Sequence, residues 1–418
     1  MADWWRRFHG WPVPAAALLV TLAAAALSAA WLAPVPFSDW AYYWHAAADP
    51  SAYERGGALM LVLGLLQPAG LSPAWTALVF NLPFVAALLW CMHRLDRSRH
   101  RLFVLSAAAG IVLLAPYLVV VQLDLSASIV LGLALVLLMA APGESARATL
   151  ARSAAALVLV AVACSTRPQF VLVLPVFAAL WWGVVVLSTR GLPDARVNRI
   201  ALVLVAGAAA GFALDSGLRA HADRSDAVRY SSGVTLYAGL FAAEVGPGCG
   251  RWSPEATRMA RADMDRPVHE AAIGRLAEHP PGHWGRVIAC KVPDIVFPGG
   301  FAMGWVLASP NVSEQLAREP DSRSTWLAWR INWALDRGWR VFVVLAYGLA
   351  VVLAVGRRDL PAWRWVPFAW LLAFWAVHLV FEIQERYFLG TVLLVPVLVA
   401  LAWRQPAADP ARRRFDQG

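Results

Sequence analysis

Long runs of apolar residues, separated by short polar segments, are the main pattern of this chain. Ten runs approach the length of membrane-spanning helices, which need roughly 20 mostly apolar residues. We therefore predict an all-α polytopic membrane protein. The predicted spans cover about residues 12–33, 72–92, 102–122, 125–141, 153–165, 169–187, 200–218, 339–356, 365–381 and 387–403.

The fifth and sixth predicted spans are separated by the turn Ser165-Thr166-Arg167-Pro168. Proline disfavours a helical conformation of the residue before it, so we expect a break at Arg167. The alternative is one long fused helix, which would reverse the orientation of every later span.

Arginine is distributed unevenly between the polar segments. With ten spans and a cytoplasmic N-terminus, the short outer segments contain only Arg55, Arg167 and Arg386. Such a bias is what the positive-inside rule requires, and fusing the fifth and sixth spans would destroy it. The arginines on the cytoplasmic side are Arg6, Arg7, Arg94, Arg97, Arg99, Arg101, Arg147, Arg152, Arg190, Arg196, Arg199, Arg357, Arg358, Arg364, Arg404, Arg412, Arg413 and Arg414.

Composition supports a membrane location. Apolar residues make up 60% of the 418 residues and charged residues 15%, whereas an ordinary soluble domain is roughly half apolar and about a quarter charged. The net charge of +9 is not gathered into a basic stripe with interleaved aromatic residues. We therefore expect no nucleic acid among the partners.

The first apolar stretch, from Trp11 to Ala33, follows Arg6 and Arg7 and could be read as a signal peptide. It is longer than the roughly 7–15 apolar residues of a signal-peptide core, and further spans follow. We interpret it as a retained first helix. The expected location is a bacterial inner membrane, crossed many times, with both termini in the cytoplasm.

The longest polar segment covers residues 219–338 and lies on the outer, periplasmic side in this topology. It separates an N-terminal membrane module (1–218), whose first outer loop covers 34–71, from the C-terminal helices and a short tail (339–418). Ser253 followed by Pro254 is typical of a helix N-terminus. Helices are predicted over about residues 254–264, 268–279 and 283–296.

The chain has four cysteines, too few for a disulfide scaffold. Cys91 and Cys164 fall in or near predicted spans and are expected to be packing residues. Cys249 and Cys290 share the outer segment, where a disulfide could persist. Both the bonded and the unbonded state remain open.

Candidate chemistry begins in the first outer loop. Ser38 can cap a helix that starts at Asp39, and Asp39 and Tyr43 are then one turn apart on one face. Trp40 and Trp44 suit the membrane interface. The alternative is an amphipathic interfacial helix whose acid only stabilises its own N-terminus.

Other charged residues fall at the predicted outer ends of the spans. A charge at membrane depth costs about 2.5–3.5 kcal/mol on insertion scales, and is therefore a functional candidate. The alternative for each is a solvated or paired residue at the rim. These residues are Asp124, Arg167, Glu382, Glu385 and Arg386.

The motif Asp39-x-x-x-Tyr43-x-x-x-Ala47, after a first span and Pro36, resembles the opening motif of GT-C glycosyltransferases, in particular the protein O-mannosyltransferase and aminoarabinose transferase group. Further matching features follow in order over nearly the whole chain. They are Tyr53-x-x-Gly56, Asp124, Arg167-Pro168, Tyr237-x-Gly239, Gly250-Arg251-Trp252, His279-Pro280, Lys291 and Glu385-Arg386-Tyr387.

The resemblance implies a GT-C-like fold and transfer of a sugar from a polyprenyl-phosphate donor to a lipid, glycan or protein acceptor. It implies a catalytic role for Asp39, as base or acceptor-orienting group, and we add Tyr43 and Asp124 as catalytic candidates. Inverting transfer needs a carboxylate to take the acceptor's proton, and the departing phosphate needs a cation. The candidates for the phosphate site are Arg386, Arg167 and Lys291, with Tyr387 and Glu385 beside them.

One departure leaves the acceptor and any metal in doubt. Many relatives have a second acid directly after the first, where this chain has Trp40. We expect neither a metal nor a cofactor. His378, Glu382 and Glu385 share a helix face, and we interpret them as partners of Arg386 rather than as metal ligands.

Two other functions remain open. A transporter or flippase of a lipid-linked sugar would more often have pseudo-symmetric halves, which we do not find. A ligase or polymerase of surface polysaccharide would also use outer-loop arginines and histidines. The acid at the start of the first outer loop favours the transferase. The sequence does not identify the sugar or the acceptor.

Overall fold

The computed structural model describes residues 12–95, 109–139, 145–222, 234–241, 250–263, 267–300 and 302–405. Within these ranges the protein is helical, with no strand. The helices are α2 (Pro12–Trp31), α3 (Ser38–Ala48), α4 (Gly57–Leu66), α5 (Pro73–Leu95), α7 (Ala115–Leu118), α8 (Leu123–Met139), α9 (Ala146–Thr166), α10 (Gln169–Thr189), α11 (Ala195–Ala220), α13 (Pro254–Ala262), α14 (Val268–Ala277), α15 (His283–Val296), α16 (Ala302–Ala308), α17 (Pro310–Arg318), α18 (Arg323–Gly356), α19 (Val366–Val380) and α20 (Phe388–Trp403).

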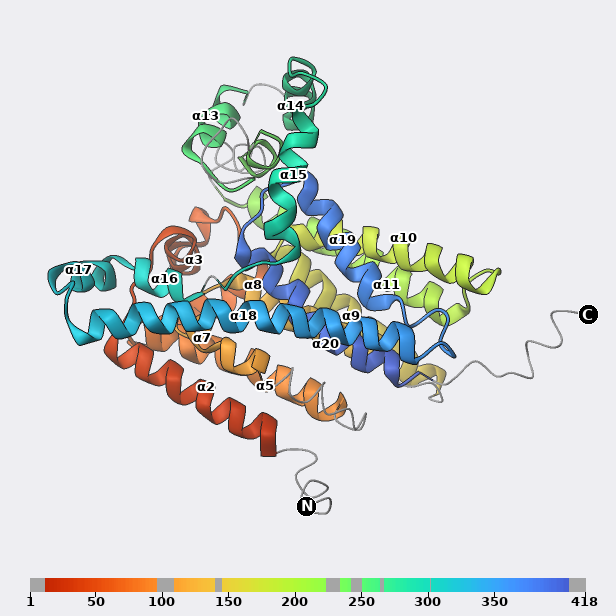
Figure 1. Cartoon of the computed structure of the whole chain (residues 1–418), viewed down its shortest axis with the longest axis horizontal. Helices are drawn as coiled ribbons and strands as arrows, with labels where there is room; N and C mark the ends of the chain where they lie inside the picture. Colours follow the sequence, from red (N-terminus) through yellow and green to blue (C-terminus); the bar gives the residue numbers. More distant parts are fainter. Residues whose placement is uncertain are drawn as a thin grey trace, which may run out of the picture.

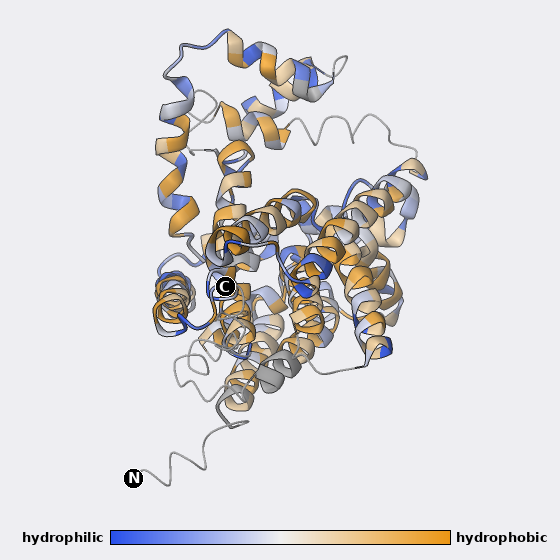
Figure 2. Ribbon diagram, turned by 90° about the vertical axis from the view of Figure 1, so that its right-hand side faces the viewer, coloured by the Kyte–Doolittle hydropathy of each residue, from blue (hydrophilic) through white to orange (hydrophobic). Residues whose placement is uncertain are grey.

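The long helices form one elongated bundle in which most helix surfaces are apolar (Figures 1 and 2). Four described helices are long and apolar enough to cross a membrane: α9, α10, α11 and α18. Shorter apolar helices lie among them, including α2, α5, α8, α19 and α20. The protein is therefore a helical membrane protein.

Helix α8 forms the centre of the bundle. Almost all of its residues are buried, and it packs against α5, α9 and α20. Small residues allow the closest contacts, because a Cβ on Gly390 of α20 would lie 2.4 Å from the Ser128 hydroxyl of α8. The α9–α11 contact is similar, since a Cβ on Gly211 would lie 2.4 Å from Cβ of Cys164. Cys164 is a free, buried packing residue, as predicted.

The break between the fifth and sixth predicted spans is confirmed. Helix α9 ends at Thr166 and α10 begins at Gln169, so two helices of 21 residues replace the fused alternative. The third predicted span, 102–122, is described only from residue 109, and that part is interrupted at Leu114. Pro116 follows directly, and its missing N–H and ring prevent a regular helix through this point.

Polar contacts tie several helix ends together at one end of the bundle. Arg196, at the start of α11, donates to the carbonyl of Met139 and to the side chain of Gln405. Arg357, after α18, donates to the carbonyls of Trp403 and Gln405. Arg196, Arg357 and Gln405 come from segments predicted to be cytoplasmic, and Met139 and Trp403 lie at the ends of the predicted spans next to them. Helices α3, α16 and α17 lie at the opposite end (Figure 1).

The helices predicted in the outer segment are present with small shifts. Helix α13 begins at Pro254 with Ser253 as its N-cap, as expected, and α14 and α15 follow. Helix α18 differs, because it begins at Arg323 and runs unbroken to Gly356. The predicted boundary at 338/339 therefore falls inside a helix, and the outer segment ends in the first half of α18.

Two details of the first loop were predicted wrongly. Ser38 does not cap α3: the helix begins at Ser38, the preceding Phe37 takes the N-cap position, and no side-chain cap bond forms. Trp40 is fully buried in the core rather than placed at an interface. In addition, α4 is an apolar helix inside this loop, where no helix was predicted.

Candidate functional site

Asp39 lies in the first turn of α3 and is 6% exposed. Its two carboxylate oxygens face two different arginines. Nη2 of Arg55 is 2.5 Å from Oδ1, and Nη1 of Arg386 is 2.5 Å from Oδ2. A carboxylate from the segment after α2 is thus held between a cation of the same segment and one that directly precedes the last helix.

The backbone around two glycines brings Arg55 into this position. Gly56 and Gly57 both have positive φ, +118° and +59°, which glycine adopts without steric cost. A Cβ on Gly57 would lie 2.4 Å from the backbone of Ser165 and Thr166, so only glycine lets the loop approach the end of α9 this closely. The guanidinium of Arg55 also lies 4.8 Å from the ring centroid of Tyr42.

A second ion pair lies beside the first. Arg167, directly after α9, pairs with Asp124 in the first turn of α8, and both are buried. The guanidinium carbon of Arg167 is 5.8 Å from the ring centroid of Tyr43, one turn after Asp39 on the buried face of α3. We call Asp39, Arg55, Asp124, Arg167 and Arg386 the charged centre.

Arg386 is held by aromatic rings as well as by Asp39. Its guanidinium carbon lies 5.4 Å from the ring centroid of Trp305 on α16 and 5.2 Å from that of Tyr387. Arginine stacked on aromatic rings is a common way to fix a guanidinium in place. The side chain of Glu385 lies outside the described part of the structure.

Several buried polar atoms on the segments that carry the charged centre have no hydrogen-bond partner among the described residues. They are the Tyr43 hydroxyl, both atoms of the Gln122 side-chain amide, Oδ1 of Asp124 and Nε1 of Trp40. Buried polar groups in proteins are nearly always paired, with protein or with bound molecules. Such a group of unpaired donors and acceptors beside three arginines is suited to an anionic, hydroxyl-rich ligand.

The charges also set the acidity of the site. Burial disfavours an ionised Asp39, but the guanidinium groups of Arg386, Arg55 and Arg167 outweigh it and hold the pKa of Asp39 well below its usual range. Burial raises the pKa of Tyr43, so its hydroxyl stays protonated and available as a donor. The charged centre therefore contains a firmly ionised carboxylate.

Glu382 adds a different carboxylate to this region. It lies in the loop between α19 and Arg386 and is 3% exposed, and it accepts a hydrogen bond from Gln384. Burial raises its pKa to about 7, although the nearby Arg386 charge opposes this. No described arginine or lysine forms an ion pair with Glu382.

Lys291 is occupied by backbone carbonyls. Its ammonium donates to the carbonyl oxygens of Gly239, Leu379 and Phe381 at 3.1, 3.0 and 2.8 Å. Burial lowers its pKa to about 7. Its three donors are thus used to join the outer helices to the end of α19, and it is not brought together with the charged centre.

The structure describes no metal site. Among the described residues, no three His, Cys, Asp or Glu side chains are grouped as metal ligands would be. His378 is stacked on Phe374 with ring centroids 4.7 Å apart, and its Nδ1 faces the Phe374 carbonyl. Cys290 is disulfide-bonded, while Cys249, with which a bond had been left open, lies outside the described residues.

Of the predicted site residues, Asp39, Tyr43, Asp124, Arg167 and Arg386 come together. The sequence reasoning missed Arg55, Gln122 and Trp305 as parts of the site. The glycine pair directly after Arg55 was the available signal, since adjacent glycines often mark a close backbone approach. Gln122 and Trp305 stand in apolar surroundings without a comparable signal.

Comparison of the chain with family models, with characterised proteins and with solved structures gave no match. Function therefore has to be inferred from the chemistry of the site itself.

Proposed function

We propose that this protein is a membrane glycosyltransferase. It moves a sugar from a polyprenyl-phosphate donor to a lipid, glycan or protein acceptor at the end of the bundle that carries α3. The observation that carries the proposal is the buried Asp39 between Arg55 and Arg386, with unpaired polar atoms beside it. Such a transfer needs a base for the acceptor's proton and a cation for the departing phosphate, and this arrangement contains both.

In the proposed reaction a hydroxyl oxygen of the acceptor attacks the anomeric carbon of the sugar. The bond from that carbon to the phosphate oxygen breaks, and its electron pair stays on the phosphate. The acceptor's proton passes to Asp39. Arg386 and Arg55 hold the phosphate as its charge grows, because a guanidinium can bind two phosphate oxygens at once.

Donor binding would also prepare the base. Asp39 is a weak base while two arginines surround it, which is why its pKa is low. A bound phosphate would compete with Asp39 for the same guanidinium groups. Their charge is then shared, the carboxylate becomes more basic, and proton transfer is favoured only when the donor is present.

The unpaired atoms give the sugar and acceptor hydroxyls a place to bind. The Tyr43 hydroxyl can donate a hydrogen bond, Oδ1 of Asp124 can accept one, and the Gln122 amide can do both. Arg167 keeps Asp124 in place. We assign these groups to binding and orientation, and the proton transfer to Asp39.

The short segments at the end of the bundle that carries α3 contain few arginines compared with those at the opposite end, and this bias supports the topology proposed with this function. We propose ten spans, cytoplasmic termini and a site that faces the periplasm of a bacterial inner membrane. Reporter fusions after Arg99, Arg196 and Ala260 would test it. A reporter that is active only outside the cytoplasm should stay inactive at Arg196 and become active at Ala260.

Mass spectrometry of the cell envelope tests the activity. Lipids, glycans and proteins from strains with and without the gene should differ by one sugar on one class of acceptor. The wild-type gene should restore that sugar, and Asp39→Asn should not. Unchanged envelopes, or a lipid-linked sugar that is moved across the membrane but never transferred, would contradict the proposal and favour a transporter.

A further inference from the structure

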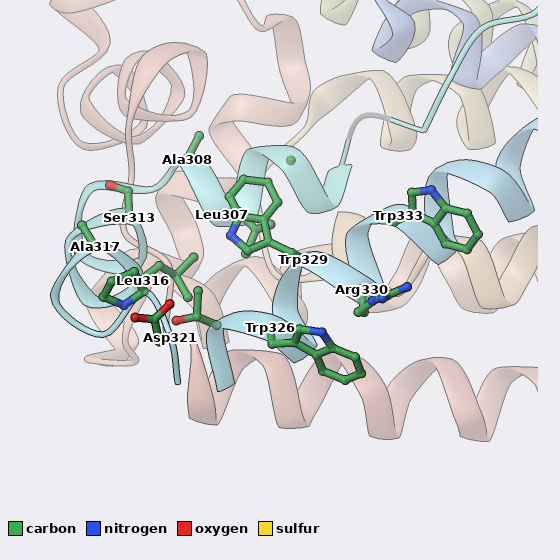
Figure 3. Close-up of a pocket in the computed structure, with 13 residues that line it drawn as sticks. Leu307, Ala308, Ser313, Leu316, Ala317, Asp321, Trp326, Trp329, Arg330 and Trp333 are labelled. Atoms are coloured by element: carbon green, nitrogen blue, oxygen red, sulfur yellow. The ribbon is translucent and has the colours of Figure 1, made fainter. Parts of the chain in front are cut away.

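A groove lies at the same end of the bundle as the charged centre, on the other side of α16. It has a volume of about 890 Å³ and is formed by α16, α17 and the first half of α18 (Figure 3). Helix α16 forms the shared wall: Trp305 stacks on Arg386, whereas Gly304 and Leu307 line the groove. The groove is therefore a separate site.

Three tryptophans of α18 line this groove. Trp326, Trp329 and Trp333 follow one another at spacings of three and four residues, so they share one face of the helix. They are 60%, 55% and 58% exposed, which is unusual for the largest apolar side chain. Tryptophan is enriched where a membrane protein meets the lipid headgroups.

The position of these three tryptophans along α18 agrees with a location at the level of the lipid headgroups. Helix α18 continues without a break into an apolar second half, where Val341, Val344 and Val351 are 59%, 56% and 50% exposed. Exposed valines on a spanning helix face the lipid chains. The groove thus opens where the lipid-facing surface of α18 reaches the headgroup layer.

Arg330 lines the groove, and Arg337 stands two turns further along α18, beside the lining residue Trp333. The guanidinium carbon of Arg330 lies 5.1 Å from the Trp326 ring centroid, and that of Arg337 lies 5.6 Å from the Trp333 centroid. Neither forms an ion pair with a described carboxylate. The one carboxylate in the lining, Asp321, lies beside α17, away from Arg330 (Figure 3).

We propose that this groove binds one membrane lipid with an anionic headgroup. Its chain lies between α16, α17 and Trp329, and its phosphate lies at Arg330 and Arg337. The apolar lining and its continuity with the lipid-facing helix surface favour a lipid over a soluble ligand. The unpaired guanidinium groups favour an anionic headgroup over a zwitterionic one. This inference does not depend on glycosyl transfer.

Photocrosslinking of the purified full chain in nanodiscs tests this proposal. Two probes with the same diazirine-bearing acyl chain are compared, one with a phosphatidylglycerol and one with a phosphatidylcholine headgroup, and the labelled peptides are mapped. We expect the anionic probe to label residues 304–333 several-fold more than the zwitterionic probe. The double variant Arg330→Gln, Arg337→Gln should remove this preference, and Trp329→Ala should reduce labelling by both probes.

Arg318→Gln is the matched control. Arg318 lies on α17 outside the groove, its side chain is 80% exposed, and its loss should leave labelling unchanged. Elution of each variant as a single species in size-exclusion chromatography verifies its folding. Uniform labelling of all lipid-exposed helices, or a headgroup preference that survives the double variant, would overturn the proposal.

Discussion

Two buried networks of tyrosine, aspartate and arginine meet at the short segment from Tyr53 to Gly57. One is the charged centre, to which Arg55 contributes. In the other, Tyr53 donates to Asp215 of α11 at 2.5 Å, and Arg219 pairs with the second oxygen of Asp215 at 2.8 Å. The two networks contain the same residue types, yet their hydrogen bonding differs.

The difference lies in how completely the tyrosine and aspartate groups are paired. The Tyr53 hydroxyl both donates to Asp215 and accepts from the backbone N–H of Gly57 at 2.9 Å. The Tyr43 hydroxyl, equally buried, has no partner among the described residues. Tyrosine and aspartate groups whose polar atoms are all paired stabilise the fold, whereas an unpaired buried group lowers stability unless a ligand binds it. We therefore assign a structural role to the network of Tyr53, Asp215 and Arg219, and a ligand-binding role to the charged centre.

The largest effect is expected for Asp39→Asn. Transfer should fall by about 10²–10⁴, the usual contribution of a general base, while the protein still inserts and folds. Affinity for the donor phosphate should rise, because Arg55 and Arg386 lose the carboxylate that competes for them. Turnover and donor affinity are measured separately on the purified protein with the donor found in the envelope comparison.

Asp49→Asn is the control for that change. Asp49 lies on the same loop, is exposed, and accepts hydrogen bonds from Ser51. Its loss should leave transfer within about twofold. If Asp39→Asn keeps near-full transfer while Asp124→Asn abolishes it, the base belongs to the second ion pair and the role assigned to Asp39 is wrong.

A smaller but still large effect is expected for Arg386→Gln. Removal of a cation that stabilises the leaving group typically costs about 10²–10³ in turnover. Arg386→Lys should recover only part of it, because lysine offers a point charge in place of a fork. The readout is kcat against KM for the donor. An intact kcat in the glutamine variant would show that Arg386 serves only to neutralise Asp39.

Much of the scaffold could be predicted from the sequence because helices begin, continue and end through interactions between residues that are close together in the chain. Apolar runs predict the long helices and Pro168 predicts the break at Arg167. Ser253 followed by Pro254 predicts the start of α13. The shared face of Asp39 and Tyr43 follows from helix geometry alone. By contrast, the first half of α18 was missed because its exposed tryptophans and arginines interrupt the apolar pattern.

The pairings within the site were harder to predict. Asp39 meets Arg386 across most of the chain, and Lys291 faces carbonyls of two distant segments. Such contacts depend on how helices pack, which spacing along the sequence does not specify. The order of motifs suggested Lys291 as a phosphate ligand, while its carbonyl partners have no sequence signature.

A pH effect on stability is expected from Glu382. Its pKa is 4.5 in an unfolded chain and about 7 in the folded protein, with burial as the main cause. Between these values the folded state holds a proton that the unfolded state has lost, so stability falls as pH rises from about 4.5 to 7. At roughly 1.4 kcal/mol per pH unit, the upper limit is about 3.5 kcal/mol.

Thermal unfolding in detergent at pH 5 and pH 7 measures this effect. The wild-type midpoint should be lower at pH 7, and Glu382→Gln should reduce the difference, because its neutral side chain does not titrate. The charges near Glu382 are those of Arg386, Asp39, Arg55 and Lys291. The first three keep their charge over this range, whereas Lys291, with a pKa of about 7, begins to lose its proton only at the upper end. An unchanged pH dependence in the variant would show that other groups cause it.

The smallest effects are expected for Tyr53→Phe and Tyr43→Phe. They test the difference between the two networks most directly, because the same hydroxyl group is removed from each. Tyr53→Phe removes a hydroxyl that makes two hydrogen bonds and leaves Asp215 without that donor, so it should destabilise the protein by about 1–3 kcal/mol. Tyr43→Phe removes a buried hydroxyl without a partner, so stability should stay unchanged or rise slightly. Transfer should show the opposite order, with little loss for Tyr53→Phe and a clear loss for Tyr43→Phe. Thermal unfolding and turnover are measured on both variants. Equal destabilisation by the two changes would mean that the Tyr43 hydroxyl is paired within the protein, and the charged centre would then lose its distinction from a structural network.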